Sequence, residues 1–286
     1  MRNTPREIVG RTTQHLLLYT GALIVLLPFV YMLCVSVREP GPGALGMFLP
    51  AGNGALGVDW SRVGLGNYIR LFVELDVIQP LLNSIFFSAA SASLATVTAA
   101  MAGYTLAKHR FVGRRAVFAT VLAALVIPGP LLLAPLYTML FRLGLLDTYA
   151  GLILPAAAPA FGVFLFRQAS ISSVPTELLE AARIDGCGEY RAFFSIALPL
   201  LRPMTSAFVL ISFLGAWNNF LLPQVILTNE DKFPLAVFVA QLRGLYGTDY
   251  GLIMASTFVS IAPVMVLFLF LQREFISGLT AGAVKG

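Results

Sequence analysis

Apolar residues in this 286-residue chain are gathered into long stretches, and charged residues are confined to the segments between them. Six stretches contain no Asp, Glu, Lys or Arg, and the shortest of them has 19 residues. A helix needs about 20 mostly apolar residues to cross a bilayer, so the pattern predicts six membrane-spanning helices. The predicted spans are residues 16–37, 81–107, 116–141, 148–166, 203–229 and 251–272.

The composition agrees with this pattern. Hydrophobic residues make up 58% of the chain and charged residues 12%, whereas a soluble domain carries roughly 25% charged residues. We therefore expect an all-α integral membrane protein in which residues 1–286 form a single transmembrane domain. The first stretch is longer than the apolar part of a signal peptide and lacks an A-x-A cleavage pattern, so we expect it to remain as a spanning helix.

The basic residues indicate the orientation of the chain. With six spans, both termini and the second and fourth loops share one side, and that side carries 13 of the 19 Lys and Arg residues. Cytoplasmic loops of membrane proteins are enriched in Lys and Arg, so both termini are predicted to be cytoplasmic. The long loop 38–80 and the loop 230–250 are then predicted to lie outside, and residues 67–75 to form a short interfacial helix.

Prolines are clustered in the third predicted span, at Pro128, Pro130 and Pro135. Each proline removes a backbone hydrogen-bond donor and tends to kink or break a helix. A membrane protein tolerates this where neighbouring helices or a watery cavity satisfy the backbone. We expect a broken helix here, beside a transport pathway.

The second span is rich in small residues, and Ala95, Ala99 and Gly103 recur at every fourth position. That spacing places them on one helix face, where another helix can approach closely. A close contact between helices is the interpretation we favour over a ligand-binding surface.

The spans lack the ionisable side chains on which several classes of function depend. None contains Asp, Glu, Lys or Arg, and the two histidines, His15 and His109, lie outside them. Proton relays and voltage sensors need such groups, and no catalytic residue, metal-ligand set or P-loop Gly-Lys pair is found. No basic patch with interleaved aromatic residues points to nucleic acid. An ion-coupled carrier, for which no inverted repeat is visible, and an intramembrane enzyme are the alternatives from other classes.

The fourth loop, residues 172–199, has a distinctive pattern. Pro175 and Gly186 bracket a short helix of about ten residues. After the glycine, apolar residues at helical spacing predict one face of a second helix. Two alternatives explain apolar faces on this loop. They lie on the bilayer surface or pack on the chain's own helices, or they insert into another protein. The residues of the second face are Tyr190, Phe193, Phe194 and Ala197.

Within this loop, a run of residues resembles the EAA motif of the membrane subunits of bacterial ATP-binding cassette importers, in every signature residue and both spacings. Asp185, directly before the glycine, is similar to the form of the motif in carbohydrate importers, and Cys187 replaces the small Ala usual after it. The matching residues are Glu180-Ala181-Ala182, then after three residues Gly186, then after nine residues Ile196, and finally Leu198-Pro199.

The resemblance implies that this loop is a coupling element that docks in a cleft of a separate cytoplasmic ATPase. Glu180 would pair with a basic group of the ATPase, Ala181 and Ala182 would allow close approach, and Gly186 would form the elbow between the two helices. The full predicted ATPase-coupling set is Glu180, Ala181, Ala182, Asp185, Gly186, Ile196, Leu198 and Pro199.

The tail at residues 273–286 resembles that of the second, six-helix permease of maltose-type importers, which reaches between the two ATPase subunits. The resemblance implies ATPase contacts for Gly278, Gly282 and Lys285. Glycines at these spacings would let the tail lie extended against another backbone.

The fifth span carries the polar residues that we expect to line a pathway, Trp217, Asn218 and Asn219. Ala216-Trp217-Asn218 resembles the corresponding segment of sugar importers. Amides can hydrogen-bond to sugar hydroxyls and an indole can stack on a sugar face, although hydrogen bonding between helices is an equally good use of them.

Together these features are similar to a permease subunit that imports a sugar or oligosaccharide by alternating access across a bacterial or archaeal cytoplasmic membrane. The alternative within the class is another solute, such as glycerol phosphate or a polyol. The resemblance implies three kinds of partner besides membrane lipid: a second permease subunit, a dimer of ATPase subunits that binds ATP and Mg, and an outer solute-binding protein. It implies no cofactor, metal or enzymatic activity in this chain.

Overall fold

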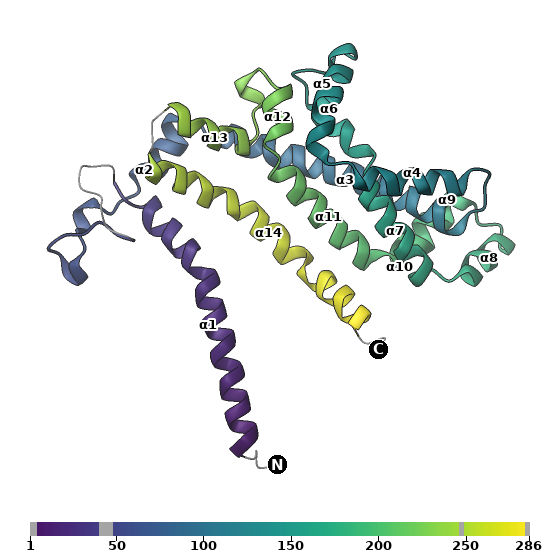
Figure 1. Ribbon diagram of the computed structural model, residues 1–286, viewed down its shortest axis with the longest axis horizontal. Helices are drawn as coiled ribbons and strands as arrows, with labels where there is room; N and C mark the ends of the chain where they lie inside the picture. Colours follow the sequence, from purple (N-terminus) through teal and green to yellow (C-terminus); the bar gives the residue numbers. More distant parts are fainter. Residues whose placement is uncertain (1–4, 40–47, 246–248, 284–286) are drawn as a thin grey trace. The chain divides into compact units, whose positions relative to one another are not determined.

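The computed structural model describes residues 5–39, 48–245 and 249–283, and every regular element in them is a helix. This confirms the predicted all-α class. Contacts between residues divide the chain into two compact units. Unit 1 contains residues 1–77 and 239–261, and unit 2 contains residues 78–238 and 262–286. The helices are labelled in Figure 1.

Four helical stretches among the described residues are long and apolar enough to cross a membrane, and up to six if each of two bent helix pairs is one span. Many of their apolar side chains are exposed, as for Leu23 at 69% and Leu269 at 57%. Exposed apolar surface on this scale fits contact with lipid. The four stretches are Arg11–Ser36, Ile78–Lys108, Tyr149–Ser173 and Tyr250–Phe270.

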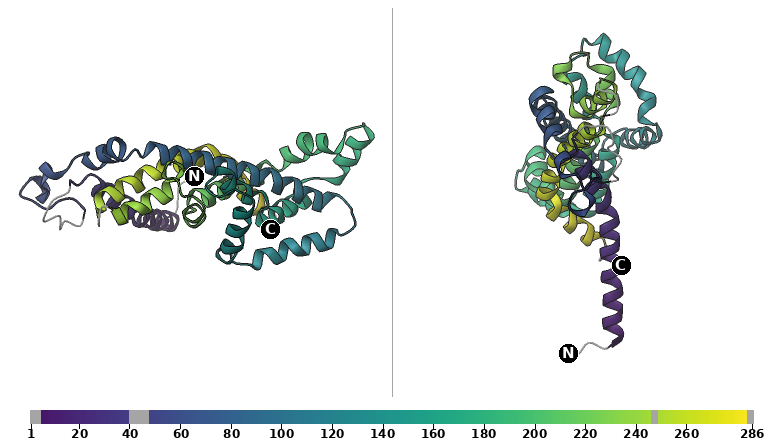
Figure 2. Two further views of the ribbon diagram at one scale, coloured as in Figure 1. Left: turned by 90° about the horizontal axis from the view of Figure 1, so that it is seen from above. Right: turned by 90° about the vertical axis from the view of Figure 1, so that its left-hand side faces the viewer.

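The third predicted span is broken, as the proline cluster indicates. α4 (Arg114–Val126) ends before Pro128, and η4 (Gly129–Leu132) and α5 (Leu133–Arg142) continue at an angle of 104°. Ile127 is extended, the conformation that a following proline favours. The sharp turn of the chain between α4 and α5 can be followed in Figure 2, left.

The fifth predicted span, residues 203–229, is not one helix, and the prediction is wrong there. α11 (Arg202–Trp217) stops at the two asparagines, and the chain is helical again only in α12 (Leu221–Ile226). The backbone and side-chain amides of Asn218 both donate to the Leu214 carbonyl, at 3.0 and 2.9 Å. Asparagine side chains compete in this way for backbone partners and favour helix ends.

In unit 1, the second half of the long loop 38–80 contains the predicted short helix, in α2 (Gly66–Ile69) and the π-turn η3 (Arg70–Glu74). Buried Asn67 donates to the carbonyls of Ser36 and Arg38 at 2.9 and 2.7 Å. A Cβ at Gly251 would lie 2.6 Å from the Asn67 side chain, so only glycine fits there. The other elements of this region are α1 (Pro5–Ser36), η1 (Ala55–Gly57) and η2 (Trp60–Arg62).

Unit 2 is built on α3 (Ile78–Lys108), which packs against α7 (Ala160–Ser173) and α11. α7 approaches α3 on the small-residue face. A Cβ added at Gly103 of α3 would lie 2.6 Å from the backbone nitrogen of Arg167, and a Cβ added at Gly162 of α7 would lie 2.8 Å from the Cβ of Ala99. The predicted close helix contact is therefore confirmed.

Short elements complete the described chain, several of them within the predicted spans. α6 (Tyr149–Ile153) is separated from α7 by η5 (Leu154–Ala157), and the stretch runs on to Ser173, past the predicted end of the fourth span at residue 166. The remaining elements are α8 (Thr176–Ile184), α9 (Glu189–Ala192), η6 (Phe193–Ala197), α10 (Leu198–Leu200), η7 (Glu230–Lys232), α13 (Leu235–Leu245) and α14 (Tyr250–Ala283).

Candidate functional site

The loop 172–199 folds as two short helical arms joined at Gly186, which confirms the predicted elbow. α8 ends at Ile184, and Gly186 has a φ of +79°. The Gly186 amide donates to the Arg183 carbonyl at 3.0 Å and the Cys187 amide to the Ala182 carbonyl at 2.8 Å. These two bonds form a Schellman motif, whose left-handed position favours glycine.

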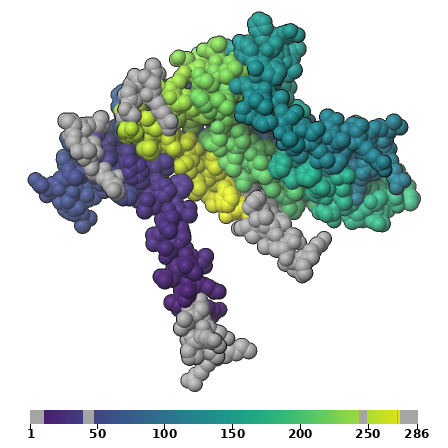
Figure 3. Space-filling view, viewed as in Figure 1, coloured from purple at the N-terminus to yellow at the C-terminus, as the bar shows by residue number. Residues whose placement is uncertain are grey.

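α8 divides into an inward and an outward face. Leu179 and Ala182 are buried, at 2% and 9% exposure, and Leu179 belongs to the core cluster of unit 2. The close approach to an ATPase that the resemblance implies for Ala181 and Ala182 stays a prediction. Glu180 and Ala181 are exposed, and so is Asp185 at the helix end. Figure 3 shows this loop, teal to green, at the surface of unit 2.

The second arm differs from its predicted single apolar face. Phe193 and Ala197 are buried at 4% and 0% exposure, but Tyr190 and Phe194 are 76% and 51% exposed. The reason is the π-turn η6, which widens the helix by one residue per turn and separates positions that an α-helix would align. Of the other predicted coupling residues, Ile196 and Leu198 are half-buried against the core cluster, and Pro199 is exposed.

An ion pair joins the two arms across the elbow. Arg183 donates to both carboxylate oxygens of Glu189, at 2.7 and 3.2 Å, and His109 lies 3.6 Å from the same carboxylate. The hydrogen bond from Arg183 lowers the pKa of Glu189 and raises the pKa of Arg183. An exposed pair of this kind contributes only about 0.2–1 kcal/mol, so it orients the elbow more than it stabilises the fold.

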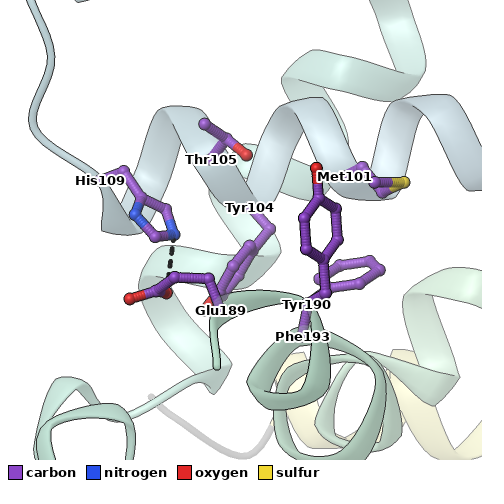
Figure 4. A pocket seen from close by; sticks show the side chains of 7 residues that line it. All are labelled: Met101, Tyr104, Thr105, His109, Glu189, Tyr190 and Phe193. Carbon is purple, nitrogen blue, oxygen red and sulfur yellow. Dashed lines mark ion pairs between the residues drawn. The ribbon is translucent and has the colours of Figure 1, made fainter. Parts of the chain in front are cut away.

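A cavity of about 330 Å³ lies between the end of α3 and the second arm (Figure 4). Buried Tyr104 of α3 packs between His109 and Phe193, with ring centroids 5.4 and 5.2 Å away. These rings pack the second arm of the loop against the end of α3. The cavity is lined by Met101, Tyr104, Thr105, His109, Glu189, Tyr190 and Phe193.

The three predicted pathway residues do not lie together. Trp217 is 6% exposed and stacks on Phe213 at 5.6 Å between ring centroids. Asn218 is exposed and bonded to its own helix. Asn219 lines a cavity between α3, η5 and α11. The structure therefore separates a packing role for Trp217 from a cavity-lining role for Asn219.

The backbone of the C-terminal tail is helical through Gly278 and Gly282, because α14 continues to Ala283. The expected extended conformation is wrong for these residues. A glycine costs about 1 kcal/mol within a helix but does not by itself end the helix. The long apolar part of α14 precedes the two glycines, and the helix continues through them. Lys285 lies outside the described residues.

A second polar cluster in unit 2 joins the loop before α6 to η7. The Asp147 carboxylate contacts Lys232 Nζ at 2.8 Å and accepts from the amides of Thr228 and Asn229 at 3.1 and 3.0 Å. These hydrogen bonds, that from Lys232 foremost, lower the pKa of Asp147 to about 2. Next to it, buried Asn83 donates to the carbonyls of Asp231 and Phe233.

The sequence offered little signal for these contacts. Arg183 and Glu189 are six residues apart across a turn, and Asp147 and Lys232 are 85 residues apart, so no helical or strand spacing links either pair. No group of three His, Cys, Asp or Glu side chains among the described residues is placed to hold a metal ion.

Comparison with known proteins gives a consistent match along the chain. The family model described as "Binding-protein-dependent transport system inner membrane component" matches residues 77–276. An arabinooligosaccharides transport system permease protein of Halalkalibacterium halodurans is 42% identical over 80% of this chain and 82% of its own. A lactose transport system permease protein of Rhizobium radiobacter is 30% identical over the full length of both chains.

Two further matches bear on substrate and fold. An sn-glycerol-3-phosphate transport system permease protein of Agrobacterium fabrum is 31% identical over 95% of this chain and 96% of its own. A chain from the crystal structure of a bacterial ABC transporter involved in the import of the acidic polysaccharide alginate superposes with a TM-score of 0.78. That match covers 96% of this chain and 99% of the other at 22% identity, and it shows a shared fold.

Proposed function

The chain belongs to the family of binding-protein-dependent transport system inner membrane components, and on that premise we propose that it is the permease subunit of an ATP-driven importer of a sugar or oligosaccharide. The family consists of transport components rather than enzymes. The membrane-spanning helices and the relatives that are permeases for arabinooligosaccharides and lactose support this function.

The observation that carries the proposal is the shape of the loop 172–199. Its first arm presents Glu180, Leu178 and Ile184 outward, the last two at 47% and 87% exposure. An outward face that combines apolar side chains with a carboxylate is suited to a protein partner, because burial supplies affinity and the charge sets register. That partner is a separate ATPase with a basic group opposite Glu180.

Coupling then follows from the packing behind that face. Leu179 of the first arm and Phe193 and Ala197 of the second belong to the same core cluster as Phe166 of α7 and Phe208 of α11. Because protein cores are close-packed and transmit displacement, movement of the ATPase shifts these helices. Alternating access results when ATP binding and hydrolysis at the partner move the loop between two positions.

The orientation and the partners are part of the same proposal. The loop 172–199 and both termini face the cytoplasm, where the ATPase dimer binds ATP and Mg. A second permease subunit completes the membrane domain, and a solute-binding protein docks on the outer loops. Gly278, Gly282 and Lys285 contact the ATPase subunits through the tail.

The alternative substrate is glycerol phosphate, which the relative from Agrobacterium fabrum favours. Cells that lack the gene and cells that carry it would be given labelled arabinooligosaccharide, lactose or glycerol 3-phosphate. We expect gene-dependent uptake of a sugar. Uptake of glycerol 3-phosphate alone would replace the sugar proposal with the alternative, and uptake of none of these or of a wider sugar panel would contradict the importer function.

The coupling assignment is tested by charge reversal at Glu180. Glu180→Lys places like charges together at the interface, which costs several kcal/mol and should reduce co-purification of the ATPase in mild detergent by at least about 30-fold, the equivalent of 2 kcal/mol. Exposed Glu230 of η7 provides a control with the same charge change on the outer side. Equal ATPase recovery with Glu180→Lys and Glu230→Lys would overturn the assignment.

A further inference from the structure

A cavity of about 270 Å³ in unit 2 lies where two interrupted helices meet α3. One interruption is η5, after which Ala158 leaves helical geometry at φ −120° and ψ 60°, and Pro155 and Pro159 line the cavity. The other is the gap between α11 and α12, where Asn219 lines it. Irregular backbone at membrane depth is tolerated where it is buried in protein or lines a water-filled cavity.

Ser91 of α3 supplies a hydroxyl to this cavity. The residue is 4% exposed, and its Oγ has no hydrogen-bond partner within the described part of the chain. By contrast, Thr96 and Thr98 of the same helix donate to carbonyls four residues earlier, at 2.7 and 2.9 Å. A buried hydroxyl without a partner is unfavourable, so Ser91 is available to a ligand in a way that its neighbours are not.

Asn219 brings a second polar group from the opposite side. Its carboxamide oxygen accepts from the Leu222 amide at 3.2 Å, which fixes the side chain and leaves its NH₂ group as a donor. Ser212 of α11 adds another hydroxyl to the lining. The rest of the lining is apolar or glycine, and no lining residue carries a charge.

We propose that this cavity binds one ring of the transported sugar within this subunit, with Ser91, Ser212 and Asn219 hydrogen-bonded to ring hydroxyls. The inference rests on the proposed importer function and deepens it. At ~30 Å³ per water the cavity has the room of about nine waters, which suits a single ring rather than a chain of rings. A phosphorylated solute is disfavoured, because an uncharged lining offers no compensation for a desolvated dianion.

Uptake by variants of the assembled transporter tests the site. Ser91→Ala should raise the KM for sugar uptake by about 2- to 10-fold, the range for loss of one neutral hydrogen bond. Gly215→Leu should abolish sugar uptake, because a Cβ at Gly215 meets nothing within 4 Å and a large side chain can enter the cavity without displacing the backbone. Ser88→Ala is the matched control, since Ser88 is equally buried and unpartnered on α3 but does not line the cavity.

A labelling experiment measures occupancy directly. With Cys34 and Cys187 replaced by serine, Ser91→Cys in the assembled transporter should react with a small water-soluble thiol reagent, and transported sugar should slow the reaction at least fivefold. Ser88→Cys should not be protected. Wild-type KM in Ser91→Ala, unchanged uptake in Gly215→Leu, or labelling of Ser91→Cys that sugar does not slow would each overturn the site. Absence of sugar uptake by the wild type would instead refute the proposed sugar-import function.

Discussion

Replacement of Gly186 by alanine tests whether the elbow of the loop 172–199 depends on a left-handed backbone. Gly186 has φ +79°, whereas Gly188, two residues later, has φ −70° and ψ 155°. A Cβ at either position meets nothing within 4 Å. The two Gly→Ala variants therefore make the same chemical change in open space, and they differ only in the backbone conformation that alanine must adopt.

The expected difference follows from this comparison. Alanine restricts the unfolded chain equally in both variants, a stabilising effect of about 0.4–1 kcal/mol that cancels between them. Left-handed geometry costs an L-residue about 1–2 kcal/mol, and only Gly186→Ala bears that cost. The loop of Gly186→Ala should therefore open about 5- to 30-fold more often than that of Gly188→Ala.

Cleavage by trypsin after exposed Arg183 reports this opening, because proteolysis follows the population of the open state when closing is fast. Gly186→Ala should be cleaved about 5- to 30-fold faster than Gly188→Ala, and sugar uptake should fall in Gly186→Ala only. Gly186→Pro should be more severe, since proline cannot adopt this φ and removes the amide that donates to the Arg183 carbonyl. Equal cleavage rates for the two alanine variants would refute the reasoning.

Three further predictions concern other contacts of the described chain. Gly103→Ala forces α7 away from α3 and should cost about 1–3 kcal/mol in thermal unfolding, whereas Gly21→Ala, which meets no neighbour, should not. Glu189→Gln, which removes the ion pair and leaves the tryptic site intact, should increase tryptic cleavage after Arg183; cleavage at the wild-type rate would count against the ion pair. Asp147 has a pKa of about 2 in the folded protein and an ordinary value of 3.8, so its stabilising effect is complete above pH 3.8 and is lost as the pH falls through 2. The wild-type melting temperature should approach that of Asp147→Asn over this interval, and a constant difference would contradict the stabilising role of the Asp147 carboxylate.

Much of the fold could be predicted from local sequence alone. Absence of charge over about 20 residues indicated the four long apolar helices among the described residues, because a desolvated charge is costly in lipid wherever it lies. Pro128 predicted the break between α4 and η4, and Gly186 predicted the elbow, because both residues act through their own backbone dihedral angles. The small-residue face of α3 likewise predicted a close neighbour, although not which helix it would be.

Other features depend on long-range packing and could not be predicted. The π-turn at Phe193 rotates Tyr190 and Phe194 away from the buried face, and its position is set by the core against which Phe193 and Ala197 pack. Likewise, Trp217 and Asn219 are two residues apart, but one packs on Phe213 and the other lines a cavity. The helix end at Asn218 decides this, and helix ends depend on competition between local and tertiary partners.

The sequence by itself determined that this is a helical membrane protein with a two-armed loop, since hydrophobic length, proline, glycine and motif spacing are properties of neighbouring residues. Only the tertiary structure decided which side chains meet. Ala182 is buried, Glu189 contacts Arg183 and His109, and Ser91 and Asn219 line the same cavity. The physical reason is that burial and hydrogen bonding between distant segments depend on how the helices pack, and no periodicity in the chain encodes that arrangement.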